Sequence, residues 1–274
     1  MMTNEQRVFF FGAGRAEGPG RTKRILAGTR VGLAEMANLG LPIPPGLTIS
    51  TAACMAYLAD GQKRLSPGLW DEISRSMTHL EAAMNRRFGD AANPLLVSVR
   101  SSVAYSMPGM MDPVHNLGLN ARTVQGLIAR TQNERFGYGA YRRFIAMFAN
   151  EVLGVPRERF EQVLEGKKAE AGVEQEAALS VKDLKELIEQ YQALVQSETG
   201  RAFPSEPYEQ LRRSILAVLD SWMGPRAVEY RRLRQMPNSE GTAIHIVPMV
   251  FGNLGETSGI GVTFTRNPST GTPG

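Results

Sequence analysis

One stretch of the chain, residues 120–199, shows only helical patterns, and strand-like segments lie on both sides of it. Apolar residues recur within it at three- and four-residue spacing, for example at Tyr141, Phe144 and Phe148, which is typical of a helix with one buried face. The strand-like segments lie at residues 8–11, 47–50, 95–99, 243–250 and 262–265. This order predicts an α+β fold in which an all-helical insert interrupts a sheet-bearing unit.

Further helices are predicted at residues 31–39, 51–61, 67–88 and 208–223. Ser66 and Pro67 supply an N-cap and a first-turn proline for the third of these helices, and Gly89 is expected to end it. Within the insert, Ser180 and Asp183 form a predicted capping box. A solvated basic face is expected after the last helix, from Arg226, Arg231, Arg232 and Arg234.

The composition is that of a globular protein suited to an anionic ligand. Hydrophobic residues make up 42% of the chain, and 31 Lys and Arg against 27 Asp and Glu give a net charge of +4. This mild excess suits a nucleotide without requiring nucleic acid. Cys54 is the sole cysteine, which excludes an internal disulfide and a multi-cysteine metal site. With no signal-peptide core and no apolar run near the roughly 18 residues of a membrane span, we expect a soluble protein of the cytoplasm, with no membrane partner.

Arg100 lies where a predicted buried strand passes into a loop rich in Gly, Pro and Met. A strand end is a rigid support, and the forked guanidinium can bind two phosphate oxygens at once. Such an arginine is a candidate ligand for a phosphate. The alternative is an arginine that pairs with a nearby carboxylate, and this segment by itself does not separate the two.

A glycine-rich turn, residues 252–261, lies between the two last strand-like segments. Glycines allow a backbone to approach an anion closely, and hydroxyl groups add donors. The residues of this kind are Gly255, Thr257, Ser258, Gly259 and Gly261. The turn is therefore a candidate phosphate cover, although a flexible hairpin tip has the same pattern.

A series of longer motifs runs along nearly the whole chain. They are LAEM (33–36), LPIPPG (41–46), SVRS (98–101), SMPGMMD (106–112), NLGLN (116–120), YRRF (141–144), MVFGN (249–253) and FTRNPSTG (264–271). In this order they resemble the nucleotide-binding domain of pyruvate, phosphate dikinase. The resemblance implies an ATP-grasp-like nucleotide-binding domain with an all-helical insert and an incomplete C-terminal lobe. Its implied parts are residues 1–119 together with 200–240, the insert 120–199, and residues 241–274 as the first hairpin of the second lobe.

The resemblance also implies roles for single residues. Met249 and Val250 are the hinge whose main chain meets the adenine edge, the turn at 252–261 covers the phosphates of ATP, and Arg100 holds them. In the parent reaction, ATP passes its β-phosphoryl group to a carrier histidine, inorganic phosphate takes the γ-phosphoryl group, and the histidine phosphorylates pyruvate. The carrier histidine belongs to another domain or chain, and the magnesium ligands are expected outside this chain.

One motif departs from the family, because the family's phosphate-binding lysine falls on Thr29 and the glycine after it falls on Arg30. Arg30 is a candidate replacement for the missing charge, but a one-residue shift can turn a side chain away from a site. We therefore expect nucleotide binding, and no full reaction by this chain alone. His79, His115 and His245 have no metal-ligand spacing and are expected at the surface or the core edge, so no residue is assigned to a metal.

Three hypotheses follow from these patterns. The first is an ATP-binding, kinase-type domain that works with a phosphohistidine-carrying partner. The second is a catalytically silent nucleotide-binding or regulatory interaction module. The third, with the weakest support, is a module that binds another anion, nucleic acid included. The strand expected near the C-terminus would be exposed, which predicts self-association or a partner chain.

Overall fold

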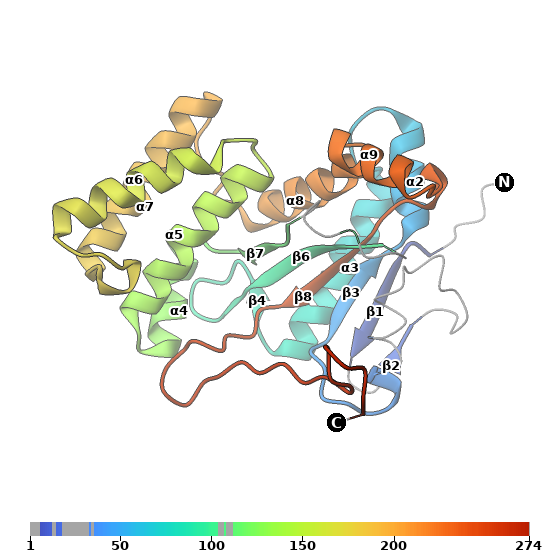
Figure 1. Ribbon diagram of the computed structural model, residues 1–274, viewed down its shortest axis with the longest axis horizontal. Helices are drawn as coiled ribbons and strands as arrows, with labels where there is room; N and C mark the ends of the chain where they lie inside the picture. Colours follow the sequence, from blue (N-terminus) through green and yellow to red (C-terminus); the bar gives the residue numbers. More distant parts are fainter. Residues whose placement is uncertain are drawn as a thin grey trace.

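The computed structural model describes residues 6–12, 15–17, 33, 36–103, 107 and 112–273. In these residues a six-stranded antiparallel sheet forms the centre, in the order β2-β1-β3-β8-β6-β7 (Figure 1). Its strands are β1 (Val8–Gly12), β2 (Arg15–Ala16), β3 (Gly46–Ile49), β6 (Val97–Ser102), β7 (Val114–Leu117) and β8 (Ala243–Pro248). Because β8 pairs with both β3 and β6, the centre of the sheet is completed only by residues that follow the helical block.

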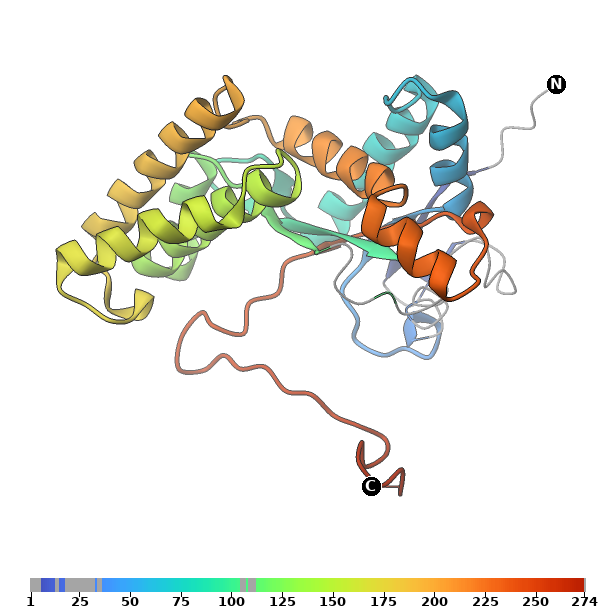
Figure 2. The same ribbon diagram turned by 45° about the horizontal axis from the view of Figure 1, so that its top comes forward.

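Three helices cover one face of the sheet. They are α2 (Thr51–Asp60), α3 (Pro67–Met84) and α8 (Pro207–Ser221), of which α3 contacts β1 and β3, α8 contacts β6 and β7, and α2 contacts β8. Figure 2 shows α3 and α8 on one side of the sheet and the C-terminal segment leaving it on the other. The sheet residues that face these helices, such as Val97, Val99 and Ile246, are fully buried, so this side is the apolar side of the core.

The described part of residues 120–199 is helical, as predicted. It holds α4 (Thr123–Thr131), α5 (Glu134–Glu151), α6 (Arg157–Ala171), the short 3-10 helix η1 (Glu176–Ala178) and α7 (Val181–Thr199). These helices lie beside the edge strand β7, which packs against α5 (Figure 1). Two elements connect α8 to β8, namely α9 (Pro225–Leu233) and the 3-10 helix η2 (Asn238–Glu240).

Local sequence signals account for several helix ends. The Ser66 side chain accepts a hydrogen bond from the Leu69 amide at the start of α3, and Pro67 takes the first helical position. The predicted capping box of α7 is confirmed, because Ser180 and Asp183 each bind the other's backbone amide. The strand at 8–11 and the helices at 51–61 and 208–223 are also confirmed.

The helix predicted at 67–88 ends earlier than expected, at Met84. Asn85 adopts a left-handed conformation with φ 49°, and its backbone amide closes the last turn onto Ala82 and Glu81. The chain then forms β4 (Arg87–Phe88), which pairs in parallel with β5 (Pro94–Leu95). Asn85 therefore ends the helix, whereas Gly89 lies beyond it in the loop between the two short strands.

The hairpin expected from residues 243–250 and 262–265 is not formed. The first of these segments is β8, which pairs inside the sheet, and residues 262–265 belong to no strand. In that region only an isolated bridge between Arg266 and Pro273 occurs among the described residues. Since β3 and β6 pair with β8 on its two sides, no edge of β8 is left for a strand that follows it.

The prediction of a solvated basic face after α8 is wrong for one of its four arginines, Arg231. Arg231 is fully buried, and its guanidinium carbon lies 3.9 Å from the ring centroid of Trp222. Its Nε atom donates to Asn238 Oδ1 at 2.8 Å. The aromatic ring offsets part of the cost of burying the charge, whereas Arg226, Arg232 and Arg234 are exposed as predicted.

Candidate functional site

The second face of the sheet carries polar side chains. Residues directly opposite each other on paired strands share a face, and the register aligns Arg100 of β6 with His245 of β8 and His245 with Thr48 of β3. Alternation along β6 adds its neighbours two residues away. We call this set the polar face of the sheet: Thr48, Ser98, Arg100, Ser102 and His245.

Arg100 is the exposed member of the polar face. The sequence placed it at the end of a strand, but β6 continues to Ser102, so Arg100 lies within the strand. Among the described residues, no carboxylate lies within ion-pair distance of its guanidinium, which removes the alternative of a paired structural arginine for that part of the chain. A cation held by a central strand is thus presented for an anion.

Two histidines lie beside Arg100. His245 is buried, and its Nδ1 atom is 2.8 Å from the Thr48 hydroxyl oxygen, which fixes the imidazole against β3. His115 of β7 is half-buried, and burial, together with the positive charge of Arg100, lowers the pKa of its imidazole. Neither histidine was expected near Arg100, because only the pairing of β6 with β7 and β8 brings them together.

The proposed adenine hinge follows β8 directly. The Met249 backbone amide donates to the Leu96 carbonyl oxygen at 2.8 Å, so Met249 continues the pairing of β8 with the start of β6. The side chain of Met249 packs against the core, whereas Val250 is 71% exposed. Leu96 precedes Arg100 by four residues, which at about 3.3 Å per residue separates the hinge from the arginine by about 13 Å along one strand.

The glycine-rich turn is folded on itself. The Ser258 amide donates to the Gly255 carbonyl oxygen at 3.0 Å. A side chain at Gly252 would meet Ile260 Cγ1 at 2.2 Å, so only glycine allows this close approach. Gly255, Thr257, Gly259 and Gly261 are exposed and Ser258 is half-buried.

The start of α5 holds the turn in place. The rings of Phe251 and Phe136 meet edge to face with centroids 5.0 Å apart, and Asn133 Nδ2 donates to the Leu254 carbonyl oxygen at 3.4 Å. Over the described residues, these contacts link the turn to α5 and not to Arg100. The structure thus places Arg100 on the strand that pairs with β8 and Met249, but among the described residues it does not bring the turn into contact with Arg100. Arg30 lies outside the described residues.

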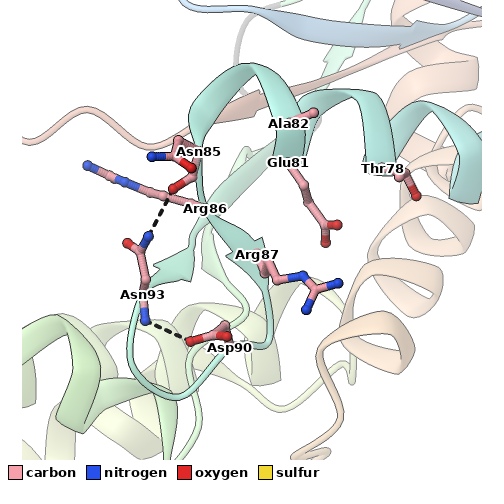
Figure 3. Close-up of a pocket in the computed structure, with 8 residues that line it drawn as sticks. All are labelled: Thr78, Glu81, Ala82, Asn85, Arg86, Arg87, Asp90 and Asn93. Atoms are coloured by element: carbon pink, nitrogen blue, oxygen red, sulfur yellow. Dashed lines mark hydrogen bonds between the residues drawn. The ribbon is translucent and has the colours of Figure 1, made fainter.

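A separate hollow of about 430 Å³ lies between the end of α3 and the β4–β5 loop (Figure 3). Figure 3 shows that Arg86 and Arg87 point to opposite sides of it. Asp90 accepts the backbone amides of Ala92 and Asn93 there, so its carboxylate is engaged by the loop itself. None of the residues assigned to the nucleotide lines this hollow.

The donor set for a metal ion does not fit. Within the described ranges, no three His, Cys, Asp or Glu side chains converge to hold a cation. Asp112 interacts instead with Glu151, whose pKa is raised by burial and by this second carboxylate. The described residues by themselves therefore provide no cluster of three donors for a magnesium ion.

The mixed helix–sheet fold carries on its polar face an exposed arginine for which no described residue supplies an ion-pair partner, and such a cation suits an anionic ligand. The chain matches the family described as "Pyruvate phosphate dikinase, AMP/ATP-binding domain" over residues 62–274, and it belongs to this family.

Its relatives are pyruvate, phosphate dikinases. The chloroplastic enzyme of Flaveria pringlei is 51% identical over 269 residues, which make up 98% of this chain and 28% of the relative. Pyruvate, phosphate dikinase 2 of Oryza sativa subsp. japonica is 50% identical over 266 residues, or 97% of this chain and 30% of the relative. The chain thus spans less than a third of the length of these relatives. Among the described residues, no helix is long and apolar enough to cross a membrane.

Proposed function

We propose that this chain is the ATP-grasp-like, ATP-binding domain of a phosphotransferase. The reaction would be that of a pyruvate, phosphate dikinase, the name that its relatives carry. ATP would pass its β-phosphoryl group to a histidine on another domain or chain, with inorganic phosphate accepting the γ-phosphoryl group, so that AMP and pyrophosphate are released. The histidine would then exchange this group between phosphoenolpyruvate and pyruvate. Phosphoryl transfer depends chiefly on positioning and on neutralising charge, and both are roles for this domain.

The observation that carries the proposal is the exposed Arg100 on the polar face of the sheet, which has no ion-pair partner in the part of the chain that the structure describes. Its guanidinium would bind phosphate oxygens, the main chain of Met249 and Val250 would meet the adenine, and the turn at 252–261 would close over the phosphates. Residues Gly255, Thr257, Ser258, Gly259 and Gly261 would contribute amides and hydroxyls to that cover, and Arg30 would add charge in place of the lysine. The magnesium ions would take their ligands from outside this chain.

We also propose that the chain divides into a subdomain of residues 1–119 with 200–240, the insert 120–199, and residues 241–274 as the start of the second lobe, although the hairpin expected there is not formed. Because β8 pairs within the sheet, the second lobe would diverge only after Pro248. The cytoplasm is proposed as the location, although the Flaveria relative is named as chloroplastic.

Calorimetry with ATP and magnesium tests the proposal on the chain as it stands. We expect saturable binding, and Arg100→Met should weaken it about 10- to 150-fold, because a hydrogen bond to a charged group contributes about 1.5–3 kcal/mol. Arg212→Met, at an exposed arginine of α8, is the matched control and should leave the affinity unchanged. Equal binding by the two variants would remove Arg100 from the site, and no binding by the parent chain would refute nucleotide binding.

The silent module is the second candidate, favoured by the absence of a metal-binding cluster among the described residues. Mixing the chain with a partner that carries the histidine domain separates the two candidates. Exchange of labelled phosphate into ATP supports the phosphotransferase, whereas binding without exchange supports the silent module.

A further inference from the structure

His115 occupies an unusual position beside Arg100. Val114 pairs with Val99, and both are buried on the apolar side of the sheet. The register shift between Val97 and Val99 sets His115 and Asn116 opposite Ser98, a member of the polar face. Side chains alternate along a strand, so His115, which follows Val114, is turned toward the side that carries Arg100. The Nδ1 atom of His115 is buried, and no described residue forms a hydrogen bond with it.

The surroundings of His115 favour its neutral form. Burial lowers the pKa of His115, and the charge of Arg100 lowers it further, because a second cation would be repelled. The backbone amide of His115 donates to Met147 Sδ of α5 at 3.4 Å, which holds the residue against that helix. A neutral imidazole with a covered, unpartnered nitrogen thus lies next to a permanent cation.

Other ionisable groups lie on the elements around His115. They are His245 on β8, Glu151 on α5, Asp112 in the loop before β7, and Arg213 of α8, which is paired with Glu209. None of these groups shifts the pKa of His115, whereas the charge of Arg100 lowers it. Glu151 and Asp112 interact with each other instead. Besides burial, which has the larger effect, the charge of Arg100 therefore influences the protonation of His115.

We propose that His115 is a second anion-contacting residue, which takes up a proton when the polyphosphate of a nucleotide binds at Arg100. The proposal rests on the proposed function. The bound anion cancels the repulsion from Arg100, and the imidazolium then donates a hydrogen bond to a phosphate oxygen from Nε2, because Nδ1 is covered by the protein. By linkage, each proton taken up on binding makes the affinity rise as the pH falls.

The chain offers a clean readout because it contains only three histidines. The imidazole carbon-bound protons are followed by NMR from about pH 5 to pH 8, with His115 assigned from the His115→Gln variant. Addition of ATP should raise the pKa of His115 by about one unit, which corresponds to about a tenfold gain in affinity across its titration. The resonances of His79 on α3, which contacts Phe10, serve as the internal reference.

Affinity measured at two pH values completes the test. The phosphates of ATP titrate in the same range, so the pH dependence is compared between the parent chain, His115→Gln and the control His79→Gln, all with the same nucleotide. The parent and the control should bind more tightly at low pH by a factor that His115→Gln lacks. Equal pH dependence in all three, or an unmoved His115 resonance while binding depends on Arg100, overturns this inference and leaves the proposed function intact.

Pyrophosphate in place of ATP separates the two claims. A rise in the pKa of His115 with pyrophosphate, but no binding of ATP, supports the anion site and refutes the nucleotide function. No response to either anion refutes both.

Discussion

Gln210 of α8 holds the segment that follows β7, and its replacement should destabilise the fold strongly. Its side chain is fully buried. Its Oε1 atom accepts the backbone amide of Gly118 at 2.9 Å, and its Nε2 atom donates to the carbonyl oxygens of Leu119 and Pro204, both at 2.9 Å. One side chain therefore satisfies three backbone groups where the chain leaves the sheet beside His115.

The cost of Gln210→Ala follows from these three bonds. The Gly118 amide is left buried without a partner, which costs about 1–3 kcal/mol, and each lost bond to a carbonyl costs about 0.5–1.5 kcal/mol. We expect the free energy of unfolding to fall by about 3 kcal/mol. With a urea m-value of about 3 kcal/mol/M, the midpoint falls by about 1 M.

Urea denaturation followed by tryptophan fluorescence measures this loss. Gln125→Ala is the matched control, because Gln125 makes a single exposed hydrogen bond to the Tyr138 hydroxyl, and it should change stability by less than about 0.5 kcal/mol. If Gln210→Ala shifts the urea midpoint no more than Gln125→Ala does, the reasoning is refuted.

Gln210→Glu separates hydrogen bonding from side-chain volume. The carboxylate keeps the acceptor for Gly118 but faces two carbonyl oxygens without a proton to donate. Burial next to these oxygens should raise the folded pKa of the new carboxyl above its unfolded value. The variant should then be least stable above that pKa and should regain stability as the pH falls through it.

Two further predictions concern the turn and the insert. Phe251→Ala removes the ring contact with Phe136, which contributes about 0.5–1.5 kcal/mol. Because this contact holds the turn against α5, calorimetry should show an ATP affinity about 2- to 10-fold weaker in the variant. The control Leu233→Ala, at an exposed leucine, should leave the ATP affinity unchanged. Burial acts to raise the pKa of Glu176, but Arg142 and Arg143 outweigh it and lower the pKa. Because the folded pKa is lowered, this stabilisation exists above the unfolded pKa of about 4.3 and is lost below it. Glu176→Gln should thus cost about 1–2 kcal/mol at pH 7 in urea denaturation and almost nothing near pH 3; an equal loss at both pH values would contradict this ion pair.

Short-range signals allowed much of the secondary structure to be predicted. Ser66, Pro67 and the pair Ser180 and Asp183 act on amides within one helical turn, so their effects can be read from neighbouring residues. The predicted end of the helix at 67–88 was wrong, because two residues near it favour a left-handed conformation. Both Asn85 and Gly89 adopt positive φ, but the last turn of α3 closes at Asn85, and Gly89 turns the loop between β4 and β5.

The site could be predicted only in part. The sequence singled out Arg100 from its position after an apolar run, and the family match agrees with the expected class of ligand. Thr48, His115 and His245 carried no signal of their own, since Thr48 and His245 lie far from Arg100 in the chain and His115 lies on the strand that follows β6. Their proximity depends on the register of four strands, and no local pattern encodes a register between segments so far apart.

The sequence by itself determined that the chain is an α+β protein with a helical block, and that it carries the motifs of a nucleotide-binding family. Periodicity and capping depend on residues close together in the chain, so they can be recognised without knowledge of the fold. The tertiary structure decided that β8 pairs inside the sheet, that Arg231 is buried against Trp222, and that the strand of Arg100 lies between the strands of His115 and His245. These outcomes depend on which distant segments exclude water together, and that choice is made by the packing of the whole sheet.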